Sequence, residues 1–285
     1  MDVNSYPLEE IAGQVGTPFY LYDGAILKQA LEDMRALTDG PELQARYAMK
    51  ANSSRAVLEA VRDAGIWIDA VSGNEVLRAQ RAGFPLGSTP PVVMLTCDVL
   101  RDNGLEVITK HGVLPNVGSP GMIRQLAKAG YRGPIAVRTN PGFGHGHVQS
   151  CDTGGPSSKH GIWHEDLDDA RRLADDAGLP VVALHAHVGT GPDIREFDAN
   201  MRRLVDHFEA LTPRFPKLEA VNFGGGVPHP YRPGRPTSWS SGIGRSCWTR
   251  ARGWRRPLGG RSGSKSSRAA TSSPAWPRWS RASTT

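Results

Sequence analysis

The sequence has no long apolar run, no secretory start and few cysteines. Its apolar runs all fall short of the roughly 18–20 residues that a membrane-spanning helix needs. Residues 1–4 lack the basic and apolar regions of a signal peptide. Cys97, Cys151 and Cys247 stand at unrelated spacings and indicate neither a disulfide framework nor a zinc knuckle. We therefore expect a cytoplasmic protein with no membrane contact and no metal site.

Acidic residues are missing after residue 219. Residues 1–219 hold 22 Lys and Arg against 28 Asp and Glu, whereas residues 220–285 hold 12 Lys and Arg and no acid. The formal charge of +6 thus arises in the tail, and the body of the chain is acidic. A basic pI is typical of nucleic-acid binding, but here it does not describe the body, so we expect no nucleic-acid partner.

The tail also lacks hydrophobic periodicity. Its Ser, Arg, Gly and Pro content is typical of disorder, but five of the seven tryptophans also fall there. This mixture is typical of a GC-rich gene read out of frame, and a one-base shift can turn residues 262–285 into a sequence that contains Glu-Pro-Gly-Arg. We therefore expect a barrel domain at 1–235 and an aberrant, disordered basic tail at 236–285.

Short β-branched runs alternate with amphipathic stretches between about residues 17 and 226. This alternation predicts parallel βαβ units, and so many in series favour a (β/α)₈ barrel over an open doubly wound sheet. We expect strands at 19–22, 45–49, 67–71, 92–95, 112–115, 135–138, 181–187 and 220–223, and helices at 25–37, 54–64, 73–82 and 196–211. Residues 144–156 are too long and too rich in Gly and His for a plain connector.

Lys50 ends one of these strands. At the carboxyl end of a barrel strand a lysine points into the mouth, where it can be desolvated and serve as a Schiff-base amine. A surface lysine just beyond a strand is the alternative, and the position alone favours it.

His185 and His187 lie two residues apart on a predicted strand and therefore share one face. They could bind a metal, stack on a planar cofactor ring, or be one buried and one exposed histidine. Residues 189–191 then form a small-residue turn whose hydroxyl, on Thr190, suits a phosphate.

Gly224, Gly225 and Gly226 follow the last predicted strand. Their amides can approach a phosphate closely, although a tight turn is an equal alternative. A strand-end lysine, a ring-stacking histidine and two glycine-rich elements together suit pyridoxal 5′-phosphate, whose aldehyde needs an amine and whose phosphate needs amides.

Motifs at 47–52 (YAMKAN), 69–75 (DAVSGNE), 185–191 (HAHVGTG) and 224–226 (GGG) resemble those of the alanine-racemase-fold decarboxylases. Those at 140–147 (NPGFGHGH), 153–155 (TGG) and 158–163 (SKHGIW) are similar to bacterial diaminopimelate decarboxylases. The resemblance covers about residues 15–234 and implies a (β/α)₈ barrel of the alanine racemase type. It would be incomplete at its C-terminal end, without the family's C-terminal β domain.

The resemblance implies roles for the cofactor-binding residues. Lys50 would bind pyridoxal phosphate covalently and, with His187 stacked on the ring, would be catalytic. Thr190 and Gly224, Gly225 and Gly226 would hold the phosphate.

The remaining roles concern charged and polar groups at the mouth. Asp69 and Glu75 would orient the cofactor, although a solvated strand end and a helix-start carboxylate are the alternatives. Arg138 would lie near the polar edge of the ring, and His145 and His147 near the substrate.

The implied reaction is decarboxylation of meso-2,6-diaminopimelate to L-lysine and CO₂, in a homodimer with shared active sites. The alternatives are a non-catalytic pyridoxal-phosphate-binding barrel and a racemase or another basic amino-acid decarboxylase of the same fold. The family places Glu-Pro-Gly-Arg where this chain has residues 267–270 (SRAA), which cannot pair with the ring nitrogen. We therefore expect an impaired enzyme.

The nucleotide sequence across the codons of Tyr231 to Trp239 tests the frame-shift hypothesis. We expect one missing or extra base, beyond which the shifted frame encodes Glu-Pro-Gly-Arg. A single open frame, with no related coding sequence in the other frames, would contradict it.

Overall fold

A computed structural model describes residues 5–38, 43–146, 152–190 and 193–226. Its strands are β1 (Arg46–Ala48), β2 (Trp67–Ala70), β3 (Val93–Thr96), β4 (Leu114–Val117), β5 (Ile135–Asn140), β6 (His145–Gly146), β7 (Ile162–Trp163), β8 (Val181–Thr190) and β9 (Ala220–Gly226). The α-helices are α1 (Leu8–Val15), α2 (Gly24–Leu37), α3 (Arg55–Asp63), α4 (Gly73–Arg81), α5 (Asp102–His111), α6 (Pro120–Lys128), α7 (Leu167–Asp176) and α8 (Ile194–Leu211). Short 3₁₀ turns occupy Met49–Ala51, His164–Asp166 and Thr212–Arg214.

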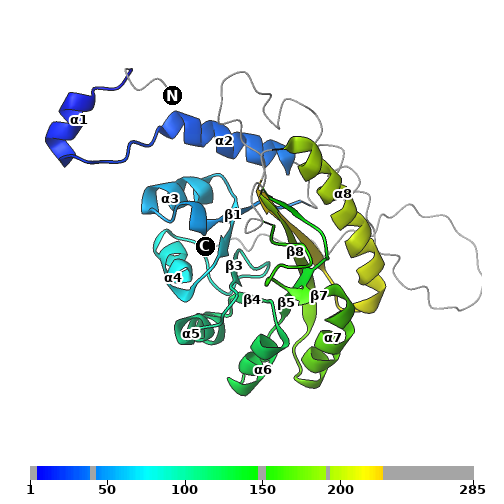
Figure 1. Cartoon of the computed structure of the whole chain (residues 1–285). Helices are drawn as coiled ribbons and strands as arrows, with labels where there is room; N and C mark the ends of the chain where they lie inside the picture. The colour runs from blue at the N-terminus through cyan, green and yellow to red at the C-terminus, as the bar shows by residue number, and fades with distance from the viewer. Residues whose placement is uncertain (1–4, 39–42, 147–151, 191–192, 227–285) are drawn as a thin grey trace, which may run out of the picture.

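The strands form one parallel sheet with the order β1-β2-β3-β4-β5-β8, and β9 pairs with β8. The short strands β6 and β7 pair with β8 and β5. The sheet curves around an interior, and helices α3 to α8 surround its outer face (Figure 1). Within the described ranges β1 pairs only with β2 and β9 only with β8, so these strands are the two edges of an incomplete α/β barrel.

Side chains alternate between the two faces of each strand and build two separate apolar cores. On β3, Val93 and Leu95 belong to the large core between sheet and helices. Met94, between them, belongs to a small inner core with Leu114, Ala136 and Ala183. The inner core is one apolar layer, and two residues further along these strands the inward side chains are polar.

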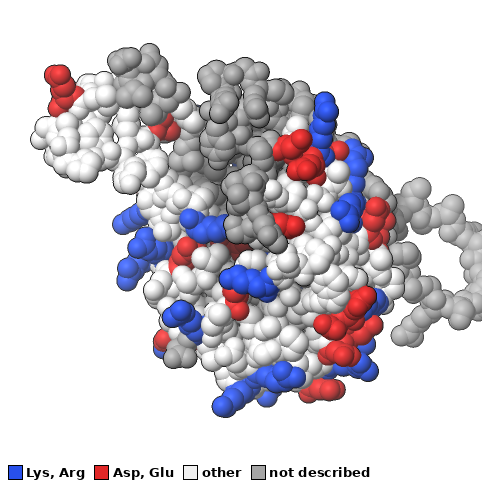
Figure 2. All heavy atoms as spheres, in the orientation of Figure 1, with Lys and Arg blue, Asp and Glu red and all other residues white. Residues whose placement is uncertain are grey.

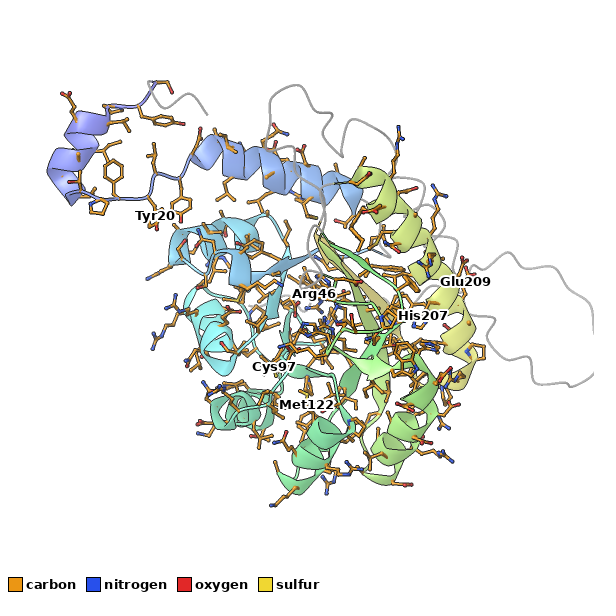
Figure 3. All side chains as sticks on the ribbon, viewed as in Figure 1. Tyr20, Arg46, Cys97, Met122, His207 and Glu209 are labelled. Carbon is orange, nitrogen blue, oxygen red and sulfur yellow. The ribbon has the colours of Figure 1, made fainter. Side chains whose placement is uncertain are left out.

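Arg46 lies in the middle of the ring of strands in Figure 3. Its guanidinium donates to the backbone oxygens of Ile68 and Val92 at 3.1 Å and of Pro91 at 2.6 Å, and it lies 4.8 Å from the ring centre of Trp67. Burial lowers the pKa of Arg46 to about 10. Arg46 therefore ties β1 to the amino ends of β2 and β3, away from the carboxyl ends where a site would form.

The predicted barrel and most of its elements are confirmed. Seven predicted strands correspond to β1, β2, β3, β4, β5, β8 and β9, and the four predicted helices correspond to α2, α3, α4 and α8. The strand predicted at residues 19–22 is wrong, because this segment pairs with no described strand. Tyr20 is 90% exposed on an arm that leads away from the barrel (Figure 3). A residue with high β-propensity forms a strand only when it can pack against a neighbouring strand, and this segment has none among the described residues.

Residues 227–285 lie outside the described residues, and with them the predicted domain boundary at 235 and the predicted tail. Among the residues that the structure does describe, no helix is long and apolar enough to cross a membrane. Figure 2 shows basic and acidic side chains interspersed over the face that it displays.

Candidate active site

Five strands bring the predicted site residues together on the inward face. Lys50 follows β1 in the turn Met49–Ala51, Asp69 lies on β2 and Arg138 on β5. His187 lies on β8, and Gly224 lies opposite it on β9. The carboxyl ends of parallel strands meet at one end of a barrel, so these residues surround a common mouth.

Asp69 is the carboxylate of this cluster. Burial raises its pKa to about 6, against the opposing effects of a hydrogen bond from Thr96 and the charges of Arg46, Arg138 and Lys50. The Thr96 hydroxyl lies 2.6 Å from Asp69 Oδ1. The Lys50 ammonium is therefore close enough to Asp69 to stabilise its charged form, while Lys50 itself is exposed at the mouth.

His187 is neutral and fixed in orientation. Burial and the positive charges of Arg138 and Lys50 lower its pKa to about 3. Its Nδ1 lies 2.6 Å from the Thr153 hydroxyl and accepts a hydrogen bond of 3.1 Å from the Gly189 amide. An amide N–H can only donate, so Nδ1 carries no proton and the proton of the ring is on Nε2.

Thr153 belongs to a motif of the sequence but was not a predicted site residue. It comes from a short turn in which Asp152 Oδ1 accepts from the amides of Gly154 and Gly155 at 3.2 and 2.9 Å. The contact joins residues 34 apart in the chain, and neither periodicity nor spacing indicates such a pairing.

His185 lies deeper than His187 and is buried, at 4% exposure. Burial, with Arg138 and His187 nearby, holds its pKa well below the ordinary value of 6.5, so the ring is neutral. Its Nδ1 lies 2.7 Å from Asn116 Nδ2. Within the described ranges no three His, Cys, Asp or Glu side chains form a group that could hold a metal.

Gly224 on β9 leaves room for the two histidines. A Cβ on Gly224 would lie 2.6 Å from His185 Nε2 and 3.0 Å from the His187 ring, so both rings face the same strand. This confirms that alternation places the two histidines on one face. Gly226 pairs with the backbone of Thr190, whose side chain, like Gly191, lies outside what the structure describes.

Arg138 is nearly buried and belongs to an ionic cluster around Asp98. Asp98 lies 3.7 Å from Arg138, 3.5 Å from Lys159 and 2.7 Å from His160 Nδ1. Burial raises the pKa of Asp98, but the hydrogen bond from His160 and the neighbouring positive charges outweigh it and hold the pKa below its usual value. The cluster connects the loop before β7 to the end of β3. Neither Asp98 nor His160 was predicted as a site residue.

Glu75 makes the helix-start contact that was the alternative to a cofactor role. Ser72 is the N-cap of α4 and accepts from the Glu75 amide, while Glu75 Oε2 accepts from the Val71 amide at 2.9 Å. This reciprocal pair resembles a capping box, except that Glu75 accepts from the residue before the N-cap. The proposed contact of Glu75 with a cofactor stays a prediction.

His145 is buried against α8 and is not in contact with Lys50 or Asp69 in the described hydrogen bonds. Its Nδ1 lies 3.1 Å from Asn200 Nδ2, and its ring packs edge-on against Phe197. A positive charge on His145 would lower the pKa of His187, so the two histidines lie near each other. His147 lies outside the described residues.

Known proteins match this chain over most of its length. Residues 25–245 match the family described as "Pyridoxal-dependent decarboxylase, pyridoxal binding domain". The chain is 37% identical over 229 residues to a diaminopimelate decarboxylase of Streptomyces coelicolor, covering 80% of this chain and 50% of that protein. It is 31% identical over 237 residues to the diaminopimelate decarboxylase of Escherichia coli K12, covering 82% and 54%.

A crystal structure of a diaminopimelate decarboxylase superposes on the chain with a TM-score of 0.76 at 31% identity. The match covers 86% of this chain and 56% of that one. The chain thus spans about half the length of the relatives it matches.

Substitution of Gly224 tests the close packing of the two histidines against β9. We expect Gly224→Ala to lower the free energy of unfolding by about 1–3 kcal/mol, because its Cβ would overlap both rings. Gly225→Ala is the matched comparison and should cost less, since its Cβ would lie 3.2 Å from Met201 Cε, 3.3 Å from Phe197 Cε2 and 3.7 Å from the Gly189 oxygen. Urea unfolding followed by circular dichroism measures both variants. Equal losses would contradict the packing that we describe.

Proposed function

Because the chain belongs to the pyridoxal-dependent decarboxylase family, we propose that it is the pyridoxal-binding half of a diaminopimelate decarboxylase. The substrate would be meso-2,6-diaminopimelate, and the products L-lysine and CO₂. The relatives named above support the substrate, since both carry that name at 31–37% identity. The observation that carries the proposal is the convergence of Lys50, Asp69 and His187 on one mouth.

The residues at the mouth fit pyridoxal phosphate. Lys50 offers an exposed amine to the aldehyde, and His187 offers a flat neutral ring held by Thr153. The absent side chain at Gly224 leaves room beside both histidines. Arg138 and Lys50 give the mouth a positive potential that suits a phosphate and a carboxylate.

When bound, pyridoxal phosphate would supply the sink for the electrons of the broken bond between Cα and the carboxylate. The residues of the chain would bind and orient. Lys50 would hold the aldehyde, His187 would cover one face of the ring, and the amides of Gly224, Gly225 and Gly226 at the end of β9 would bind the phosphate. Asp69 and Arg138 would fix the polar edge, because both are half-buried and held in place: Asp69 accepts from Thr96 on the neighbouring strand β3, and Arg138 pairs with Asp98 just beyond β3.

A cytoplasmic location and a homodimer with shared active sites belong to the same proposal. The location is the expectation drawn above from the start of the sequence and its cysteines, whereas the homodimer is implied by the resemblance for intact family members. Sedimentation of the purified chain tests the second.

Borohydride trapping tests the proposed role of Lys50. The full chain is incubated with pyridoxal phosphate, reduced and digested, and mass spectrometry locates the adduct. We expect a phosphopyridoxyl group on Lys50 and none at that site in Lys50→Ala, whereas Lys110→Ala, on the exposed face of α5, should retain it. An adduct spread over surface lysines would contradict the site.

Release of CO₂ and L-lysine from meso-diaminopimelate tests the reaction in the same preparation. We expect turnover below about 1 s⁻¹, the lower end of typical enzymes, because residues 267–270 replace the Glu-Pro-Gly-Arg motif. An adduct on Lys50 with no decarboxylation at all would favour a binding protein, and a racemised product would favour a racemase.

A further inference from the structure

A line of hydrogen bonds crosses the interior of the barrel from β2 to β8. Asp69 Oδ1 lies 2.6 Å from Thr96 Oγ1, and Asn116 Nδ2 lies 3.0 Å from the same oxygen. Asn116 Nδ2 also lies 2.7 Å from His185 Nδ1. Thr96, Asn116 and His185 are 8%, 1% and 4% exposed, so solvent does not compete for these bonds.

The chemistry of the four groups fixes the direction of every bond. Burial raises the pKa of Asp69 only to about 6, so at pH 7.5 its carboxylate is ionised and only accepts. Thr96 therefore donates its hydroxyl proton to Asp69, and its oxygen must accept from Asn116. The amide nitrogen of Asn116 then also faces His185, whose Nδ1 accepts. The proton of the neutral His185 ring is consequently on Nε2.

The orientation of the Asn116 amide has a cost. Its Oδ1 is buried and has no hydrogen-bond partner in the described part of the chain. An unpaired buried carbonyl oxygen is unfavourable, so this orientation depends on the two bonds that Nδ2 donates. The opposite orientation, with Oδ1 towards His185, would require the ring proton on Nδ1, and the tautomer therefore distinguishes the two.

The line ends inside the candidate site. A Cβ added to Gly224 would lie 2.6 Å from His185 Nε2, and the His187 ring borders the same glycine. Asp69, at the other end, lies within the influence of the Lys50 charge. Asn116 and Thr96 themselves touch neither Lys50 nor Gly224 in the described contacts, and they act through the groups that do.

We propose that Asn116 and Thr96 are positioning residues, which hold His185 as a neutral ring protonated on Nε2 and Asp69 as an oriented acceptor beneath the cofactor site. The positioning role rests on the proposed function, since the oriented groups would border bound pyridoxal phosphate. The line of hydrogen bonds itself belongs to the chain without a cofactor and can be measured there.

Nitrogen-15 NMR of the histidine-labelled full chain at pH 7.5, without cofactor, reads the tautomer directly. His185 is assigned by the signal that is lost in His185→Gln. We expect a protonated Nε2 and an unprotonated Nδ1. A proton on Nδ1 of the unmodified chain would overturn the proposal, whatever the variants do.

Asn116→Asp keeps the shape and removes the donor. We expect the proton to move to His185 Nδ1, and pyridoxal phosphate to bind about tenfold more weakly, the effect of losing one buried hydrogen bond. Thr96→Val leaves the Asn116 donor in place, so the His185 tautomer should stay unchanged while the Asp69 carboxyl titrates at higher pH. A His185 ring that keeps its tautomer in Asn116→Asp would refute the positioning role.

Asn200→Asp is the matched control, because Asn200 is the partner of His145 in a second buried pair and its Oδ1 faces Arg203 at 3.5 Å. It should move the proton of His145 and leave the His185 signals unchanged. Changes at His185 in this variant would show a general loss of structure and overturn the specific assignment. If the tautomers behave as expected but neither the unmodified chain nor any variant binds pyridoxal phosphate, the proposed function fails and the hydrogen-bonded line stands. If pyridoxal phosphate binds but the tautomers do not change in the variants, the positioning role fails and the proposed function stands.

Discussion

The two-residue alternation of side chains along parallel strands is the constraint on which the rest of this structure depends. It separates β3 into Val93 and Leu95, which pack against helices, and Met94 and Thr96, which face the interior. The same alternation gives β3, β4, β5 and β8 an outer apolar side and an inner side that changes from apolar to polar towards the carboxyl end. The helices therefore stabilise the sheet from outside, and the interior near the mouth is left for polar chemistry.

Polar groups inside a barrel must be paired, and here the pairing also determines charge. Asp69 is held by Thr96 within reach of three positive side chains, and Asp98 is held by Arg138 and His160. His185 and His187 are neutral because burial and the neighbouring cations oppose a further positive charge. A mouth with fixed cations, one oriented carboxylate and two neutral rings suits an anionic ligand that carries an aromatic ring.

The sequence predicted the parts of the fold that follow from local pattern. The barrel, seven strands and four helices were predicted because their periodicity is local, and Lys50, Asp69 and His187 because they stand in motifs at strand ends. The strand predicted at 19–22 was wrong because its aromatic residues indicate a strand only when a partner strand is present. Thr153, Asn116 and Asp98 were missed as site residues because their contacts join segments 34 to 69 residues apart.

The central claim is that the inward face at the carboxyl ends of β1, β2, β8 and β9 is a pyridoxal phosphate site. A crystal structure of the chain grown with pyridoxal phosphate tests it most directly. The account predicts density that is continuous with Lys50, a ring against His187 and a phosphate at the amides of Gly224, Gly225 and Gly226 at the end of β9. Pyridoxal phosphate bound elsewhere on the chain, with this face empty, would contradict it.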